Sequence, residues 1–210
     1  MNRTIILSTV HGAEGIQENK KLIESFGLNC IHVGSKKELE SLKIDDTCSI
    51  ISDRTTFLIP DDIIKKTSGL TVNLHNSLLP LHPGSYALFW SCMYGDPYGL
   101  TVHNLSNKLD EGDILFQLKI NYNYNNTFKE VYEETRKKAQ LAMKLLVSSI
   151  IENYEYFPLN ICKNSWTMHL TKNAKPLLEL LPNSWDTKII DARNILKGKT
   201  DESGRRIDNI

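Results

Sequence analysis

One stretch of the sequence carries three side chains of the types that move protons. Asn73 and His75 alternate along a predicted strand, so both side chains point to the same side of it. Asp110 lies in a predicted tight turn between two further strands, residues 99–103 and 114–118. An amide donates hydrogen bonds, an imidazole titrates near neutral pH, and a carboxylate can hold an imidazole in place. Together they predict a polar cluster that could move protons.

The elements that precede these residues alternate between strand and helix. The apolar pattern predicts strands over residues 3–10, 28–33, 48–52 and 70–73, and helices over residues 16–26, 36–42 and 60–66. Such alternation is typical of the α/β class with a doubly wound, mostly parallel sheet. In these sheets ligands bind at the carboxyl ends of the strands, which is where Asn73 and His75 lie.

Two helices are predicted after the strand that carries Asn73. Pro83–Gly84 breaks the chain, and a helix over residues 85–94 follows. Thr127 and Glu130 form a capping box, and from there apolar residues recur at helical spacing as far as Ile150. We interpret this long helix as a packing element and not as a site.

A chain of 210 residues fits one domain with a small appendage. We expect a catalytic domain over residues 1–153 and a C-terminal extension over residues 154–210 that packs on it. Trp166 and Trp185 in this extension are interpreted as packing residues. The extension could also shape an acceptor site or a homodimer contact.

Composition narrows the class of protein. Hydrophobic residues make up 40% and charged residues 24%, as is ordinary for a globular protein. Lys and Arg equal Asp and Glu at 25 each, which argues against a nucleic acid as the main partner. The four cysteines show no paired spacing, which favours a reduced cytoplasmic protein over a disulfide scaffold or zinc site. The apolar run over residues 4–10 is too short for a signal peptide or a membrane span, so we expect no membrane association.

A longer motif surrounds the polar cluster. It consists of Asn73-x-His75-x-Ser77-Leu78-Leu79-Pro80, then Gly84, then Gly99-x-Thr101-x-His103, and finally Asp110-x-Gly112-Asp113-Ile114. In order and spacing these elements resemble the 10-formyltetrahydrofolate-dependent formyltransferase family. The resemblance is clearest from residue 57 to residue 120.

The resemblance implies an N-formyltransferase with a Rossmann-like core, which passes a formyl group from 10-formyltetrahydrofolate to a primary amine. In such a reaction Asn73 would donate to the developing oxyanion, His75 would relay a proton, and Asp110 would hold the imidazole. No metal is implied, and His75, His103 and Asp110 lack a recognised ligand spacing.

The resemblance also suggests binding residues. For the folate these are Phe57, Leu58, Ile59, Asn73, Leu109 and Asp110, and for the acceptor they are Gly84, Trp90 and His103. Two simpler interpretations stay open: residues 57–59 could line the core, and His103 could be an ordinary strand histidine. Ser77 is interpreted as structural, with its hydroxyl bonding the backbone after the strand.

The acceptor has to be inferred by comparison within the family. Glycinamide ribonucleotide formyltransferases carry a Gly-Asn-Gly-Ser-Asn phosphate loop where this chain has residues 11–15, and Glu14 there would repel a phosphate. Methionyl-tRNA formyltransferases add a basic domain for which residues 154–210 are too short. We therefore expect a small amine, above all a nucleotide-linked amino sugar of surface polysaccharide biosynthesis. A purine-pathway enzyme, a formyltetrahydrofolate hydrolase and a non-catalytic folate-binding module remain alternatives. His11 and His82 show no partner in the sequence and are interpreted as surface residues.

Overall fold

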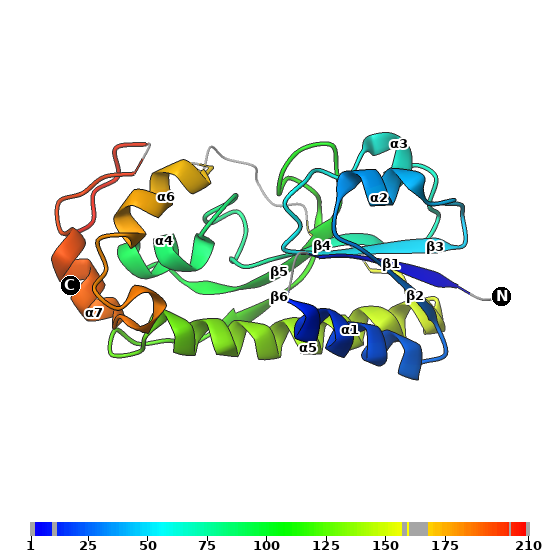
Figure 1. Ribbon diagram of the computed structural model, residues 1–210, viewed down its shortest axis with the longest axis horizontal. Coiled ribbons are helices and arrows are strands. Elements are labelled where there is room, and N and C mark those ends of the chain that lie inside the picture. Colours follow the sequence, from blue (N-terminus) through cyan, green and yellow to red (C-terminus); the bar gives the residue numbers. More distant parts are fainter. Residues whose placement is uncertain (1–2, 10–11, 157–158, 160–167, 202, 209–210) are drawn as a thin grey trace. The chain divides into compact units, whose positions relative to one another are not determined.

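The computed structural model describes residues 3–9, 12–156, 159, 168–201 and 203–208. Its elements are, in chain order, β1 (Thr4–Thr9), α1 (Ala13–Ser25), β2 (Asn29–Val33), α2 (Lys36–Ser41), β3 (Cys48–Asp53), α3 (Asp61–Ile64), β4 (Thr71–His75), α4 (Ala87–Tyr94), β5 (Tyr98–Asn104), β6 (Ile114–Ile120), α5 (Phe128–Glu152), α6 (Thr171–Leu178), the 3-10 turn η1 (Ser184–Asp186) and α7 (Ile189–Leu196) (Figure 1). The elements predicted up to residue 150 are all present, with ends that differ by a few residues.

The strands form one six-stranded sheet in the order β2-β1-β3-β4-β5-β6. Strand β1 pairs in parallel with β2 and β3, and β3 pairs in parallel with β4. A helix separates each of these strands from the next along the chain, and all six residues of β3 are buried. Burial on both faces explains why these strands are continuous apolar runs and not alternating ones. The predicted α/β class with a doubly wound, mostly parallel sheet is confirmed.

The chain divides into two compact units. Unit 1 consists of Met1–His75, Val102–Phe116 and Ala139–Asn160, and unit 2 consists of Asn76–Thr101, Gln117–Lys138 and Ile161–Ile210. The domain boundary expected at residue 153 stays a prediction, because compactness groups residues by contact and not by independent folding.

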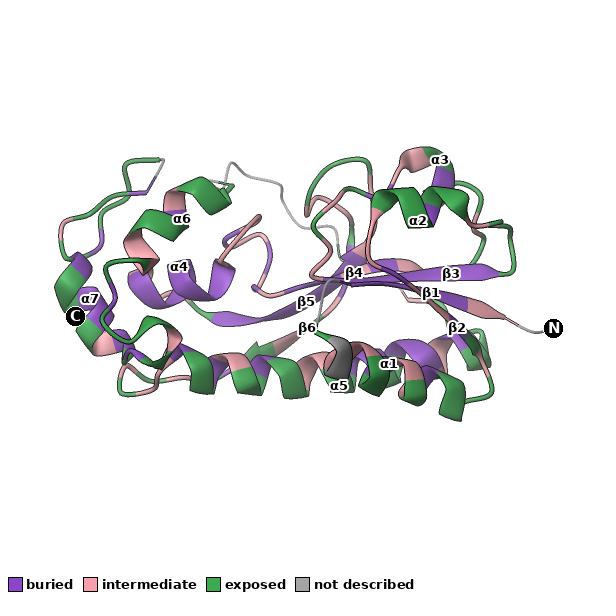
Figure 2. Cartoon of the chain, in the orientation of Figure 1, coloured by how far each residue is buried: buried purple, intermediate pink, exposed green. Residues whose placement is uncertain are grey.

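Unit 1 is organised around β1 and β3. Helices α2 and α3 cover one face of these strands and α1 covers the other (Figure 1). The strands are buried while the outer sides of α1 and α2 are exposed (Figure 2). One part of the core joins Ile6, Val33, Leu39, Cys48, Ile50, Ile59 and Ile63. Burying each large aliphatic side chain contributes roughly 1.5–3 kcal/mol, so this core holds the strand ends in place.

Unit 2 has an aromatic core. Its large buried side chains are Phe89, Trp90, Tyr98 and Phe128, and the residues after position 168 that pack with them are Ala174, Leu181, Ile189, Ala192, Leu196 and Ile207. Trp185 packs edge-on against Phe128 with ring centroids 5.7 Å apart, which confirms its packing role. His11 and Trp166 lie outside the residues that the structure describes, and Glu14 is described only as part of the α1 backbone.

Arg193 of α7 ties the last helices to α4. The Arg193 side chain is buried, and its Nη1 donates to the carbonyl oxygens of Cys92 at 3.0 Å and Met93 at 2.7 Å. A cation at the carboxyl end of a helix offsets the negative end of the helix dipole. No helix among the described residues is long and apolar enough to cross a membrane.

Candidate active site

Strand β4 presents two polar side chains. Val72 and Leu74 are buried in the core, so the alternation of the strand turns Asn73 and His75 to the other side. Asn73 is half-buried and His75 is 8% exposed. Asn73 and His75 therefore form one polar surface at the end of β4.

Four side chains of unit 1 converge on this surface. The Nδ1 atom of His75 lies 3.4 Å from Oδ1 of Asp110, and Nε2 of His103 lies 3.7 Å from the same oxygen. The Nδ2 atom of Asn73 lies 3.1 Å from Nε2 of His103. The amide, imidazole and carboxylate that the sequence predicted to lie together are thus in one cluster, and His103 bridges them.

The hydrogen positions in this cluster follow from the partners. The carbonyl oxygen of Asn104 can only accept, so Nδ1 of His103 donates to it at 2.9 Å. In neutral His103, Nε2 is then the acceptor, and the Asn73 amide nitrogen donates to it. An amide nitrogen carries two hydrogens, so Asn73 keeps one for an oxygen that becomes negative during a reaction.

The turn that carries Asp110 is shaped by Gly112. Asp110 has the left-handed backbone angle φ 54°, and its side chain is only 3% exposed. A Cβ atom on Gly112 would overlap the carbonyl oxygen of Asn104 and lie 3.1 Å from Nδ1 of His103. The Asn104 amide donates to the carbonyl oxygen of Asp113 at 2.8 Å. The Asp-x-Gly-Asp spacing thus brings the turn against β5 and places the Asp110 carboxylate beside both imidazoles.

The Asp110 carboxylate favours positive charge on the His75 imidazole. A carboxylate within hydrogen-bonding or ion-pair reach stabilises an imidazolium, and low solvent exposure strengthens the attraction. His75 faces Asp110 through Nδ1, which leaves Nε2 as its second position for proton exchange. Together with the second Asn73 hydrogen, the cluster can stabilise an oxyanion and move a proton at the same place.

The residues predicted to bind the folate differ in exposure. Leu58 is 53% exposed and Leu109 is 40% exposed. Phe57 is half-buried, and Ile59 is buried in the core with Ile63, as the simpler interpretation of residues 57–59 expects. Exposed apolar side chains fit a flat ring system, but the contacts themselves stay predictions.

Two residues predicted to bind the acceptor, Gly84 and Trp90, belong to unit 2. Trp90 is fully buried and stacks on His169 with centroids 4.6 Å apart, so in this conformation its side chain contacts protein only. Gly84 has φ 91°, and a Cβ atom there would overlap the carbonyl oxygen of His169. His103, the third such residue, is buried beside Asn73. The acceptor contacts of all three residues stay predictions.

Two sequence interpretations were wrong. His82 is not a surface residue: it is 2% exposed, with Nε2 3.0 Å from Asp96 Oδ2 and Nδ1 3.0 Å from His169 Nε2. The Ser77 hydroxyl is fully buried and bonds no backbone group among the described residues. No pattern in the sequence indicated that His82 is buried, because its partner His169 lies 87 positions away.

Thr101 was missed as a positioning residue. Its hydroxyl donates to the Ser77 carbonyl oxygen at 2.6 Å and accepts from the Leu79 amide at 3.0 Å. Nε2 of Gln117 donates to the same hydroxyl at 2.9 Å. The Gly99-x-Thr101-x-His103 spacing was a usable signal, because it places Thr101 on the same side of β5 as His103.

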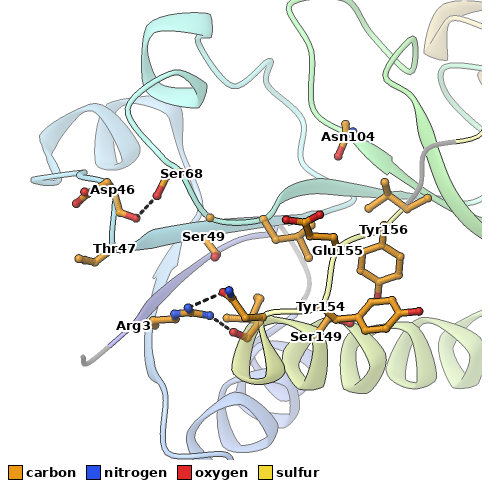
Figure 3. Close-up of a pocket in the computed structure, with 15 residues that line it drawn as sticks. Arg3, Asp46, Thr47, Ser49, Ser68, Asn104, Ser149, Tyr154, Glu155 and Tyr156 are labelled. Carbon is orange, nitrogen blue, oxygen red and sulfur yellow. Dashed lines mark hydrogen bonds between the residues drawn. The ribbon is translucent and has the colours of Figure 1, made fainter.

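Unit 1 also has a polar groove of about 510 Å³, lined by residues that include Ser49, Asn104 and Tyr154 (Figure 3). The three predicted catalytic residues do not line it. Arg3 at its edge donates to the carbonyl oxygen of Ile150 and, at 2.8 Å, to Oδ1 of Asn153. Arg3 thus binds the carboxyl end of α5, so this wall of the groove has a structural role.

The family model for formyl transferases matches residues 49–149, which include the whole cluster. A methionyl-tRNA formyltransferase of Porphyromonas gingivalis is 27% identical over 60% of this chain and 39% of its own length. A GDP-perosamine N-formyltransferase of Brucella melitensis is 29% identical over 49% of this chain and 40% of its own length. The chain thus spans about two fifths of the length of these curated relatives.

Solved structures share the fold over most of the chain. The formyltransferase PseJ of Anoxybacillus kamchatkensis, crystallised with UDP-4,6-dideoxy-4-formamido-L-AltNAc and tetrahydrofolate, gives a TM-score of 0.74 at 25% identity and covers 89% of this chain and 95% of its own. A 4-N formyltransferase of Francisella tularensis gives a TM-score of 0.70 at 18% identity and covers 98% of this chain and 95% of its own. Fold and motif define an α/β protein of the formyltransferase type. Residues 49–149 match the formyl transferase family, which confirms the family resemblance that the sequence predicted.

Proposed function

We propose that this protein is a 10-formyltetrahydrofolate-dependent N-formyltransferase whose acceptor is the primary amine of a nucleotide-linked amino sugar. The observation that carries the proposal is the cluster of Asn73, His75 and Asp110 within the segment that matches the family. Its three groups lie in reach of one another directly or through His103. Cosubstrate binding is supported by the exposed apolar side chains of Leu58 and Leu109.

The residues divide the chemistry between them. Formyl transfer requires that the attacking amine lose a proton, that the formyl oxygen be stabilised as it becomes negative, and that the departing nitrogen of the folate gain a proton. Asn73 donates its second amide hydrogen to the formyl oxygen; one such donor is worth about 3–4 kcal/mol of barrier. Nε2 of His75 takes the proton of the amine and returns it to the departing nitrogen. Asp110 stabilises the imidazolium between these two transfers.

The acceptor class rests on the relatives. PseJ matches this chain over nearly all of its own length and was solved with a UDP-linked formamido sugar. The chain has no net charge, which disfavours a tRNA acceptor.

The test is to incubate the protein with 10-formyltetrahydrofolate and one acceptor at a time: a UDP-linked or dTDP-linked 4-amino sugar, glycinamide ribonucleotide, methionyl-tRNA, or none. We expect tetrahydrofolate release and a formamide product only with an amino sugar nucleotide, followed by absorbance and mass spectrometry. Release without an amine would identify a hydrolase, and no release at all a binding module. Formylation of methionyl-tRNA or of the ribonucleotide instead would reject the sugar acceptor.

The same assay tests the catalytic residues. We expect His75→Ala and Asp110→Ala to lower turnover about a hundredfold or more with the fold intact, because each removes part of the proton transfer. His32→Ala and Glu111→Gln are matched controls, since His32 lies on β2 and bonds Thr9, while Glu111 is a partly exposed neighbour of Asp110. A variant at His75 or Asp110 with nearly full activity removes that residue from the mechanism.

A further inference from the structure

A short loop of unit 1 connects β3 to α3 and carries three of the residues predicted to bind the folate, Phe57, Leu58 and Ile59. Its first residue, Arg54, has the left-handed backbone angle φ 56°. In a residue other than glycine, such an angle persists only where the surrounding structure holds it. We call residues 54–59 the β3–α3 loop.

The main chain of this loop is held by few contacts of its own. Among the described residues, the backbone groups of residues 55–59 form no hydrogen bond to another main-chain group. At the far end of the loop, Ile59 is 4% exposed and packs in the core with Ile63. Apolar packing thus fixes the end of the loop, and its start depends on side-chain contacts.

Thr55 supplies these contacts. Its Oγ1 donates to the carbonyl oxygen of Ser8 at 2.8 Å, lies 3.0 Å from the Ser8 hydroxyl and accepts from the Ser52 hydroxyl at 3.0 Å. A hydroxyl has one hydrogen and two acceptor sites, so these three contacts use its whole capacity. Ser8 is fully buried and Ser52 is 3% exposed. Thr55 is therefore bonded to β1 and β3 at once, away from water.

The partners of Thr55 lie next to the catalytic cluster. In the parallel register of the sheet, Ser8 of β1 pairs with Ser52 of β3, and Ser52 pairs with Asn73 of β4. Residues in register point to the same face of a sheet, and neighbouring strands lie about 4.8 Å apart. Two hydroxyls and the catalytic amide thus form one row within unit 1, and Thr55 is bonded to the first two.

The loop also meets the segment that leads to Asp110. Phe57 of the loop and Leu105 of that segment pack against the same apolar core of unit 1. Leu109, further along the segment, is 40% exposed, and Leu58 of the loop is 53% exposed. One of these two exposed leucines directly precedes the catalytic carboxylate, and the conformation of the loop decides where the other lies.

We propose that Thr55 is a positioning residue for the cosubstrate: its hydroxyl holds the β3–α3 loop on the ends of β1 and β3, in the conformation that binds the folate. The proposal rests on the proposed function, because the folate contacts of residues 57–59 are themselves predicted. When a binding conformation is populated only part of the time, the observed affinity falls by that fraction. Thr55 therefore acts on the affinity for folate and not on the proton transfers.

The test compares Thr55→Val with Thr55→Ser. Valine has nearly the shape of threonine but lacks the hydroxyl, whereas serine keeps it. Thr56→Val is the matched control, because Thr56 is the next residue of the loop and is exposed. The measurements are hydrogen exchange of the Phe57 and Leu58 amides without ligand, the Kd for tetrahydrofolate without acceptor, and kcat and the KM for 10-formyltetrahydrofolate with saturating acceptor.

We expect Thr55→Val to raise the exchange rates, the Kd and the KM about tenfold with kcat little changed, because the loop loses its bonds to the strand ends. Thr55→Ser and Thr56→Val should match the unmodified protein in all of these quantities. Ser52→Ala removes one of the three contacts and should raise the same quantities about threefold. This second variant decides the matter where Thr55→Val does not fold.

Unchanged exchange in Thr55→Val, an equal rise of the Kd in Thr55→Ser, or a fall in kcat with an unchanged KM overturns the proposal. Tetrahydrofolate binding with unchanged exchange rejects the role of Thr55 alone. An unmodified protein that binds no tetrahydrofolate rejects the proposed function and with it the cosubstrate role of Thr55. The exchange comparison needs no ligand, so it still decides whether Thr55 holds the loop.

Discussion

At Gly112 the turn that carries Asp110 passes too close to β5 for any side chain. A Cβ atom there would overlap the carbonyl oxygen of Asn104, the atom that accepts from His103. We expect Gly112→Ala to push this carbonyl away, to disturb the His103 and Asp110 positions, and to lower turnover by about a hundredfold, since misplacement near 1 Å can cost that much. Steady-state kinetics with 10-formyltetrahydrofolate and the accepted amine give the measurement.

Gly34→Ala is the matched control for this change. A Cβ atom on Gly34 would lie no closer than 3.6 Å to any neighbour, an ordinary contact. We expect full activity and an unchanged melting temperature for it. If Gly112→Ala were as active as Gly34→Ala, the tight turn would have no part in placing the catalytic carboxylate.

For single residues, the sequence was informative only about partners a few positions apart along the chain. Asn73 and His75 are two positions apart on a strand, so their common side followed from the alternation. His82 and Asp96 had no such relation, and the partnership of His82 with His169 depends on the packing of α4 against the last segment. The burial of Trp90 was also invisible, because a tryptophan pattern does not tell a core position from a binding platform.

The first turn of helix α5 contains a capping box that marks the start of the helix. The predicted capping box is present: the Glu130 amide donates to the Thr127 hydroxyl at 3.1 Å, and the Thr127 amide donates to Oε2 of Glu130 at 3.0 Å. We expect Thr127→Ala to lower the free energy of unfolding by about 1 kcal/mol, because an N-terminal amide loses its acceptor. Urea unfolding measures it, with Glu133→Ala, an exposed change in the same turn region, as control. Equal stability of the two variants would contradict the role of the cap.

Helices α6 and α7 were not predicted. Neither begins with a side-chain cap that would mark its start, and α6 contains Pro176, which is atypical of a helix interior. Their stability comes from the aromatic core of unit 2 and from buried Arg193, which binds the end of α4. In the strands and α5 the apolar residues recur at regular spacing, so these elements were predictable. The segment after residue 168 instead depends on neighbours distant in the sequence.

For the whole molecule, the 25 acidic and 25 basic residues cancel, so acid stability depends on particular carboxylates and not on net charge at neutral pH. Asp201 is one of them: burial raises its pKa, but hydrogen bonds from Ser203, Tyr94 and two backbone amides lower it more. Burial likewise raises the pKa of Asp96, but hydrogen bonds from His82 and Arg205 lower it more. Both groups belong to unit 2, so we expect unit 2 to become less stable in acid.

The sign of this effect follows from proton linkage. A carboxyl whose pKa is lower in the folded chain than in the unfolded chain stabilises the folded chain at pH values above its unfolded-state pKa, about 3.9. This stabilisation is lost as the pH falls through the folded-state pKa.

We expect Asp96→Asn to lower the free energy of unfolding by about 1 kcal/mol at neutral pH, since Asp96 is partly exposed. We also expect the free energy of unfolding to decline less steeply in this variant below about pH 4. Urea unfolding from pH 7 to 3 measures both. Asp62→Asn, whose ion pair is exposed, should change neither quantity. An Asp96→Asn profile parallel to that of the unmodified chain below pH 4 would show that acid unfolding begins elsewhere.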